Sequence, residues 1–246
     1  MFDSKLPVSY YKKIGVLNKE HDLYIVQHIE TGKIYIKKLM TVYNLAVYEQ
    51  LFKHPIKNVP RIYAMYENNG LLTVIEEYIS GDTLQEILDI HGPLSEAEAI
   101  SYTMQLCDIL SEMHSLKTPI IHRDIKPSNI ILTEDGRVIL IDLNAARLYT
   151  GQKGGDTRLI GTVGYAAPEQ FGFRSSSPQT DIYATGVLLT ELIGCPLEND
   201  KSSSNHRISH KLGKIIDRCL RMEPSKRYNS AYALKTALNN CFKLSL

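Results

Sequence analysis

Three absences limit what this chain of 246 residues can be. Its 28 Lys and Arg residues nearly balance its 27 Asp and Glu residues, so the net charge of +1 predicts no strong attraction to nucleic acid or acidic membranes. The longest apolar stretches fall far short of the roughly 18 residues that a membrane-spanning helix needs. The first ten residues carry Asp3, Lys5 and Pro7 without an apolar core, so we expect no secretory signal.

Paired cysteines are missing as well. The four cysteines lie far apart, without a Cys-x-x-Cys pair, at Cys107, Cys195, Cys219 and Cys241. Their spacing argues against a zinc site and favours buried thiols in a reducing cytoplasm. No repeat or low-complexity tract is present, so the length fits one large domain or two lobes that share a cleft.

The first third of the chain alternates apolar and polar residues as strands do. The predicted elements are strands at Leu23–Val26 and Lys33–Lys38, a helix over Tyr43–Phe52, and strands at Arg61–Tyr66 and Leu71–Glu76. The helix prediction rests on apolar residues at helical spacing, and a His-Pro pair ends it.

After Ser80 and Gly81 the pattern changes to that of helices. Ser95 and Glu98 have the spacing of a capping box, and the apolar face that follows continues to Ser115. The remaining predicted elements are strands at Asn129–Leu132 and Arg137–Ile141 and helices at Gln179–Ile193, Ile208–Met222 and Ser230–Cys241. The pattern therefore predicts an α+β protein, with a small sheet-rich lobe joined at residues 78–82 to a larger helical lobe.

One octapeptide carries most of the chemical information. Residues 122–129 read His-Arg-Asp-Ile-Lys-Pro-Ser-Asn, which places a carboxylate (Asp124), a cation (Lys126) and a carboxamide (Asn129) on one short loop. Phosphoryl transfer needs an acceptor for the proton of the attacking hydroxyl, a cation for the moving phosphate and an oxygen ligand for magnesium. The octapeptide resembles the catalytic loop of protein kinases.

This resemblance implies a fold and an activity. The fold would be bilobal, one protein kinase catalytic domain over residues 1–246, with a small antiparallel-sheet N-lobe and one helix in 1–79 and a mostly helical C-lobe in 80–246. The activity would be transfer of the γ-phosphate of ATP, with Mg2+, to Ser and Thr hydroxyls of proteins, autophosphorylation in trans included. Asp124 and Lys126 would be catalytic, and Asn129 would bind the metal. Neither nucleic acid nor a membrane is an expected partner.

A second motif supports the same resemblance. Asp142-Leu143-Asn144 stands where kinases have Asp-Phe-Gly, whose Asp chelates magnesium, and it follows Asn129 by thirteen residues and one hairpin. Leu143 still offers an apolar plug, and Asn144 can adopt a positive φ at modest cost. Asp142 is therefore the second expected metal ligand.

The segment Gly161–Glu169 resembles the Ala-Pro-Glu end of the kinase activation segment, and the Gln170 that follows is typical of bacterial serine/threonine kinases. The resemblance implies that Glu169 forms a structural ion pair with Arg227. It also implies that Asp181 anchors the catalytic loop through backbone amides.

The choice of acceptor depends on Lys126 and Thr162, which follow the serine/threonine pattern of the family. The Thr162 hydroxyl can bond both Asp124 and Lys126 and close the site. A phosphate at Thr157 would order the surrounding loop by docking on Arg123, and an unmodified flexible loop is an equal alternative.

Two neighbouring lysines, Lys37 and Lys38, compete for the role of nucleotide lysine. Alternate residues of a strand share a face, so the apolar face of Ile34 and Ile36 carries Lys38 inward. Alignment with the third strand of the family selects Lys38 as well. Its expected partner is Glu49, the only carboxylate on the helix that follows.

By the same resemblance, the backbone of Glu77 and Ile79 would meet the adenine edge, and Ile131 would also contact the cofactor. Glu76 falls at the gatekeeper position, where an apolar residue is commoner. A carboxylate buried there needs a hydrogen-bond donor or access to water.

The glycine-rich loop of the family is missing. Val16, Asn18 and His21 stand where its three glycines belong, with only Gly15 nearby, so the backbone cannot approach phosphates in the usual way. The side chain of His21 or Lys19 could compensate, but an ordinary β-turn without a phosphate contact is the favoured alternative. This departure keeps open a pseudokinase that binds nucleotide or partners without turnover, and a related small-molecule kinase is a third alternative.

Overall fold

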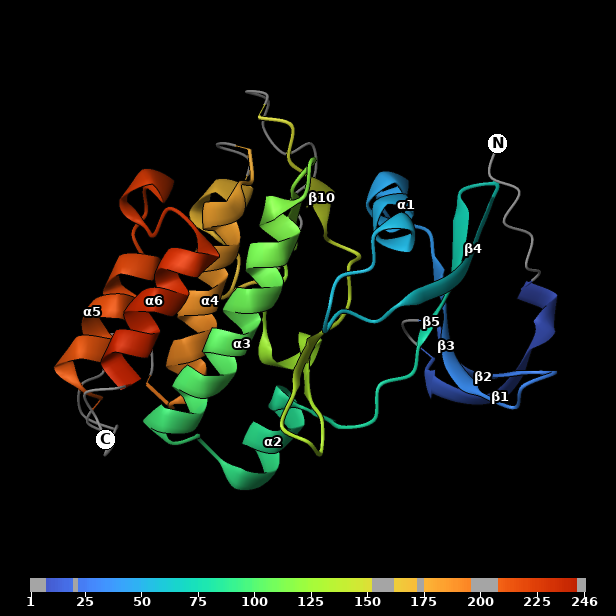
Figure 1. Ribbon diagram of the computed structural model, residues 1–246, viewed down its shortest axis with the longest axis horizontal. Coiled ribbons are helices and arrows are strands. Elements are labelled where there is room, and N and C mark those ends of the chain that lie inside the picture. Colours follow the sequence, from blue (N-terminus) through green and yellow to red (C-terminus); the bar gives the residue numbers. More distant parts are fainter. Residues whose placement is uncertain (1–7, 20–21, 152–161, 172–174, 196–207, 243–246) are drawn as a thin grey trace. The chain divides into compact units, whose positions relative to one another are not determined.

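Five antiparallel strands form the sheet of the first unit, Met1–Ser80, in the order β1-β2-β3-β5-β4. The computed structural model describes residues 8–19, 22–151, 162–171, 175–195 and 208–242. A 3-10 helix at Val8–Tyr10 precedes the sheet, and helix α1 connects β3 to β4 and lies beside the strands (Figure 1). The elements are β1 (Tyr11–Asn18), β2 (Leu23–His28), β3 (Ile34–Met40), α1 (Leu45–Lys53), β4 (Ile62–Asn68) and β5 (Leu71–Glu77).

An apolar core holds this sheet together. Val26, Ala64 and Ile75 are buried at its centre, and the partly buried rings of Tyr24 and Tyr35 pack against them. Helix α1 buries Val47, Tyr48 and Leu51, which recur at helical spacing. Along β3, buried residues alternate with partly buried ones, as expected when one face of a sheet is more covered than the other.

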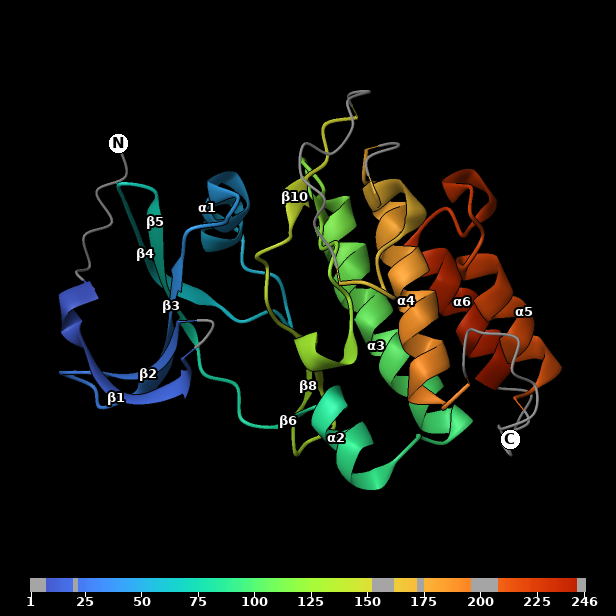
Figure 2. The ribbon, with the colours of Figure 1, turned by 180° about the vertical axis from the view of Figure 1, so that it is seen from behind.

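The second unit, Gly81–Leu246, is mostly helical. Figure 2 shows α3, α4, α5 and α6 packed side by side. Capping boxes begin α2 at Thr83 and α3 at Ser95, where each hydroxyl accepts the N–H of a glutamate that bonds back. The helices are α2 (Leu84–His91), α3 (Glu96–Ser115), α4 (Pro178–Leu192), α5 (His210–Cys219) and α6 (Ala231–Phe242).

Short strands and 3-10 helices of the second unit carry the loops that concern function. One small sheet has the order β6-β8-β9, and a second pairs β7 with β10. The strands are β6 (Asp82–Thr83), β7 (Ile120–Ile121), β8 (Ile130–Leu132), β9 (Val138–Leu140) and β10 (Arg147–Leu148). The 3-10 helices are Pro127–Asn129, Pro168–Phe171 and Pro224–Lys226.

The α+β class, with a small antiparallel-sheet part and a larger helical part, is confirmed. The capping box at Ser95 and the helix to Ser115 are also confirmed. Helix α2 was not predicted, because eight residues offer too few apolar repeats for a clear period. The predicted helix Ile208–Met222 is shorter in the structure, where α5 ends at Cys219.

The cysteines are free thiols, and three of them, Cys107, Cys219 and Cys241, are buried. Burial raises the pKa of Cys219 to about 12, so this thiol stays protonated and acts as a packing group. Along the described part of the chain, no helix has both the length and the apolar character needed to cross a bilayer. His21, Thr157 and Gly161, which the sequence singled out, lie outside the described residues.

Candidate active site

The loop between β7 and β8 presents two charged side chains on one side. Ile125 and Pro127 are buried, whereas the intervening Asp124 and Lys126 are half-buried. Lys126 has an extended backbone, with φ −159° and ψ 163°. Residues two apart on an extended chain share a face, so the buried Ile and Pro anchor the loop while the carboxylate and the ammonium point to the other side.

These two groups and Thr162 form a closed cluster. The Thr162 hydroxyl donates to Asp124 Oδ1 at 2.7 Å and accepts from Lys126 Nζ at 2.8 Å. Lys126 Nζ also lies 3.0 Å from Asp124 Oδ2. The predicted double contact of the Thr162 hydroxyl is thus confirmed. Each of the three groups orients the other two.

The cluster also determines the charge of Asp124. Burial raises the pKa of its carboxyl, but hydrogen bonds from Thr162 and Lys126 and the charge of Lys126 outweigh that effect. The pKa therefore lies below its ordinary value, and Asp124 is ionised at neutral pH. An ionised carboxylate can orient the hydroxyl of an acceptor placed beside it and can accept the proton of that hydroxyl.

Asp181 of α4 anchors the backbone of this loop. Its fully buried carboxylate accepts the backbone N–H of His122 at 3.0 Å and that of Arg123 at 2.9 Å, and His114 Nε2 lies 2.8 Å away. The prediction for Asp181 is confirmed. Arg123 has φ 71°, a left-handed conformation that costs a residue with a side chain about 1–2 kcal/mol. The Asp181 contacts offset this cost.

A buried ion pair ties the 3-10 helix Pro168–Phe171 to Pro224–Lys226. Arg227 Nη1 and Nη2 lie 2.7 and 2.8 Å from the two carboxylate oxygens of Glu169. Thr180 also donates to Glu169, and three backbone carbonyls accept from the guanidinium. The predicted Glu169–Arg227 pair is confirmed, and its complete hydrogen bonding offsets the cost of burying both charges.

The β8–β9 hairpin brings the two expected metal ligands to one end. Ile130 pairs with Leu140, and the Ile141 N–H donates to Asn129 O at 2.9 Å, so Asn129 and Asp142 occupy adjoining positions. Asn129 Nδ2 donates to Asp124 O at 2.8 Å and to Asp124 Oδ2 at 2.9 Å. This double contact orients the carboxamide and directs its oxygen away from Asp124.

These donors fit a magnesium ion. Mg2+ prefers oxygen ligands and usually takes one or two protein side chains together with substrate phosphates and water. One oriented amide oxygen and the half-buried carboxylate of Asp142 meet that description. Within the described ranges, no group of three or more His, Cys, Asp or Glu side chains could hold a metal.

The turn after β9 differs from the prediction in one respect. Asp142, with φ 62°, has the positive φ, and Asn144 is not among the described residues that have one. Asn144 instead donates its backbone N–H to Asp142 Oδ1 at 3.2 Å. Asp tolerates the left-handed conformation because its short side chain bonds locally. Leu143 is buried, as an apolar plug would be.

In the first unit, Lys38 is buried and Lys37 is half-buried. The inward direction of Lys38 that the strand period predicts is confirmed. Its Nζ lies 2.7 Å from Glu76 Oε1. Among the described residues, no ion pair joins Lys38 to Glu49, which is half-buried on α1. The buried carboxylate of Glu76, at the gatekeeper position, thus has the Lys38 ammonium as the donor that its burial demands.

The expected adenine contacts lie at the end of β5 and beyond it. The Glu77 N–H donates to Arg61 O at 2.8 Å. Ile79 follows the strand and is half-buried, and no backbone hydrogen bond of the described chain uses its N–H. In the second unit, Ile131 lies on β8 opposite Thr83 and Ile139.

At the start of the sheet, β1 and β2 pair with register shifts between Lys13 and Gly15 and between Val16 and Asn18. Gly15 pairs with Ile25 and Val16 with Tyr24 as β1 and β2 run antiparallel. A Cβ at Gly15 would meet Ile25 at an ordinary 3.6 Å, so the glycine is not required by a close approach. Val16 and Leu17 are half exposed. In the described part of β1 and β2, Gly15 is the one glycine, and it lies in a strand pairing.

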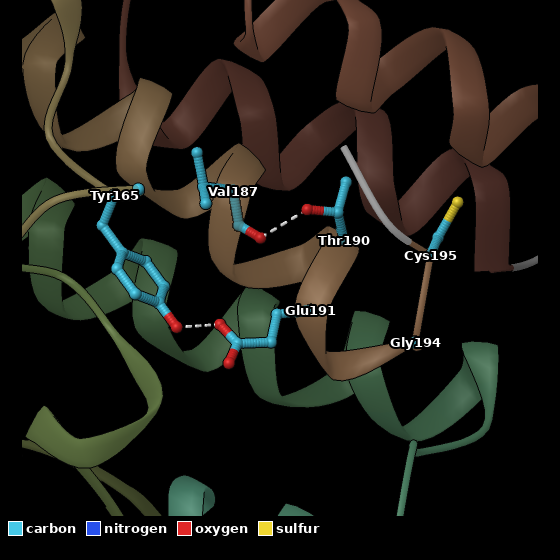
Figure 3. Close-up of a pocket in the computed structure, with 7 residues that line it drawn as sticks. Tyr165, Val187, Thr190, Glu191, Gly194 and Cys195 are labelled. Atoms are coloured by element: carbon cyan, nitrogen blue, oxygen red, sulfur yellow. Dashed lines mark hydrogen bonds between the residues drawn. The ribbon is translucent and has the colours of Figure 1, made fainter. Parts of the chain in front are cut away.

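One hollow was not predicted from the sequence. It measures about 420 Å³ and lies between α4 and the segment after Thr162 (Figure 3). Inside it the Tyr165 hydroxyl donates to Glu191, and burial raises the pKa of Tyr165. The available signal was Glu191, an acid that follows the apolar residues Val187, Leu188 and Leu189 of α4. The lining residues are Gly164, Tyr165, Val187, Thr190, Glu191, Gly194 and Cys195.

Comparisons with known proteins show which family the chain matches. A family model described as "Protein kinase domain" matches residues 13–239. The chain is 34% identical over 213 residues to Serine/threonine-protein kinase D of Synechocystis sp., covering 79% of this chain and 41% of the relative. It is 36% identical over 198 residues to Serine/threonine-protein kinase PknA of Nostoc sp., covering 73% of this chain and 35% of the relative.

A third relative is more distant. Serine/threonine-protein kinase PrkC of Bacillus subtilis is 27% identical over 208 residues, which cover 77% of this chain and 32% of the relative. The chain thus spans well under half the length of each of these three curated relatives.

Proposed function

We propose that this chain, which belongs to the protein kinase domain family, transfers the γ-phosphate of ATP to Ser and Thr hydroxyls of proteins. Residues 1–246 would form one catalytic domain, with 1–79 as N-lobe and 80–246 as C-lobe. The single observation that carries the proposal is the closed cluster of Asp124, Lys126 and Thr162. The names of the relatives support the choice of Ser and Thr.

Asp124 would be the catalytic base. Its lowered pKa keeps it ionised, so it can orient the acceptor hydroxyl and take its proton. Lys126 shares the exposed side of the loop and would stabilise the charge of the transferred phosphoryl group. The Asp181 contacts hold the loop before substrate arrives, which lowers the reorganisation that catalysis requires.

Asn129 and Asp142 would hold Mg2+, which when bound neutralises charge on the nucleotide phosphates. Lys38 would contact the phosphates from the first unit, and Glu77, Ile79 and Ile131 would contact the adenine part. The catalytic unit would operate in the cytoplasm, where ATP is present and buried thiols stay reduced.

The acceptor would be a protein. The segment from Thr162 to Glu169 is held at both ends, by the Asp124 cluster and by the Arg227 ion pair, and it borders the hollow at Tyr165. A segment fixed at both ends beside a hollow supports binding of a peptide chain. A second copy of this chain is one candidate acceptor, through autophosphorylation in trans.

Labelled ATP, Mg2+ and a generic basic protein test the proposal. Label on Ser or Thr, lost in Asp124→Asn, is the expected result. Asp108→Asn is the matched control, because Asp108 is an exposed α3 residue paired with Lys235 at 2.6 Å. Nucleotide-dependent thermal stabilisation without label transfer would identify a binding module. Phosphorylation of a small molecule alone would contradict a protein acceptor.

A further inference from the structure

A buried ion pair lies on the inner face of the first unit's sheet. Lys38 Nζ on β3 is 2.7 Å from Glu76 Oε1 on β5, and the two side chains are only 8% and 9% exposed. Two charges this deeply buried are stable only when they compensate each other, because each loses its hydration. Glu76 therefore contributes directly to holding the Lys38 ammonium where it is.

The backbone register brings these two residues together. In the β3–β5 pairing, Lys38 lies opposite Val74, and Ile36 lies opposite Glu76. Residues two apart on a strand share a face, so Glu76 is the diagonal neighbour of Lys38 on that face. Diagonal positions lie about 7–8 Å apart, which long side chains span. The contact thus follows from the pairing of two central strands.

Glu49 is placed differently. It lies on α1, a helix of nine residues whose N-cap, Asn44, makes no side-chain cap hydrogen bond. Among the described residues no ion pair joins it to Lys38. A lysine held from a helix moves when that helix moves. A lysine held by the neighbouring strand keeps its place as long as the sheet is formed.

We infer that Glu76 is the positioning residue of Lys38 and performs the task that the family pattern assigns to Glu49. The inference rests on the proposed function of Lys38 as the nucleotide lysine. The gatekeeper residue of this chain, Glu76, then acts through its charge. This assignment also places a partner of the nucleotide lysine on β5, the neighbouring strand.

Affinity for ATP with Mg2+ tests this assignment, through Glu76→Gln compared with the matched variant Glu49→Gln. Misplacement of a positioned group by about 1 Å can cost up to a hundredfold, so we expect Glu76→Gln to weaken ATP binding about tenfold or more. Glu49→Gln should stay within about twofold, the change expected of a residue outside the site. The KM of the acceptor protein should not change in either variant.

A double-mutant cycle separates positioning from a merely structural role. If Glu76 acts through Lys38, Glu76→Gln should weaken ATP binding in the wild-type background and have no further effect in a Lys38→Met background. Equal losses in both backgrounds would overturn the inference. So would a Glu76→Gln variant within twofold of wild-type affinity, or a larger loss in Glu49→Gln.

Folding does not decide the outcome. If Glu76→Gln fails to fold, Glu76→Asp retains the charge with a shorter reach, and an affinity between wild type and Lys38→Met is the expected result. If Glu76→Asp binds ATP as tightly as the wild type, the position of the carboxylate does not matter for Lys38, and the inference is overturned. Absence of phosphate transfer in the wild type would contradict the proposed function alone, because the binding measurements rank Glu76 and Glu49 without turnover.

Discussion

The loop around Asp124 and the sheet around Lys38 hold their charged groups by different means. The loop depends on segments far apart in sequence: Thr162 closes the cluster, and Asp181 of α4 binds the loop backbone. In the sheet, one neighbouring strand supplies the partner of Lys38. A loop has no regular hydrogen bonds of its own, so each anchor matters. A sheet places side chains by register, so a different strand residue can take over the partner's task.

The largest expected effect tests the loop side of this comparison. Asp142→Asn removes a charge from the proposed metal site, and we expect kcat to fall about 100- to 1,000-fold, as when one electrostatic stabiliser is removed from other enzymes. Phosphate transfer measured against Mg2+ concentration checks this. Asp135→Asn is the control, because Asp135 is exposed on the turn of the same hairpin. Equal activity of the two variants would exclude Asp142 from the site.

Arg227→Met tests how strongly the second unit depends on its distant anchors. The change leaves Glu169 buried without its cation, and losing one partner of a buried pair costs about 3–5 kcal/mol of unfolding free energy. Urea denaturation measures it. Lys226→Met, next along the chain and exposed, should stay within about 0.5 kcal/mol. A small loss in Arg227→Met would mean that this anchor is dispensable.

In the sheet, Lys37→Met and Lys38→Met differ by one position and by the face that they occupy. Lys38 is buried beside Glu76, whereas Lys37 is half-buried, so only the Lys38 change should reduce phosphate transfer, by about tenfold or more. Initial rates at several ATP concentrations check this. The reverse order would move the nucleotide lysine to Lys37 and reopen the alternative that the sequence left.

The smallest effect concerns pH. The Thr162 hydrogen bond helps to lower the pKa of Asp124 against the effect of burial, so Thr162→Val should raise that pKa. A base with a raised pKa becomes protonated at higher pH, so activity should be lost sooner as the pH falls. The acid limb of the kcat/KM profile measures the shift. Thr162→Ser keeps the hydroxyl and should keep the wild-type profile.

Predictions from the sequence were accurate where a motif indicates both the residue and the group that it contacts. Asp181, Thr162 and the Glu169–Arg227 pair were predicted from motif resemblance, and the structure confirms their contacts. The inward direction of Lys38 followed from the two-residue period of a strand. The partner of Lys38 was not predictable in this way, because Glu76 becomes its neighbour only through the register of β3 with β5.

Local pattern did not predict the conformation of one turn or the presence of the hollow. The positive φ falls at Asp142 and not at Asn144, although both residue types tolerate it. The hollow beside Tyr165 and Glu191 joins residues 26 positions apart, and no short-range signal links them. These features depend on how distant segments pack, which a one-dimensional pattern does not contain.

The order of amino acids by itself determined the α+β class, the short loop that carries Asp124, Lys126 and Asn129, and the membership of residues 13–239 in a known family. These depend on local period and on residue types at set offsets. Tertiary structure alone decided that Glu76 neutralises Lys38 and that Asn129 turns its amide nitrogen toward Asp124. The physical reason is that the partner of a buried polar group is chosen by three-dimensional proximity, which strand register and loop anchoring create.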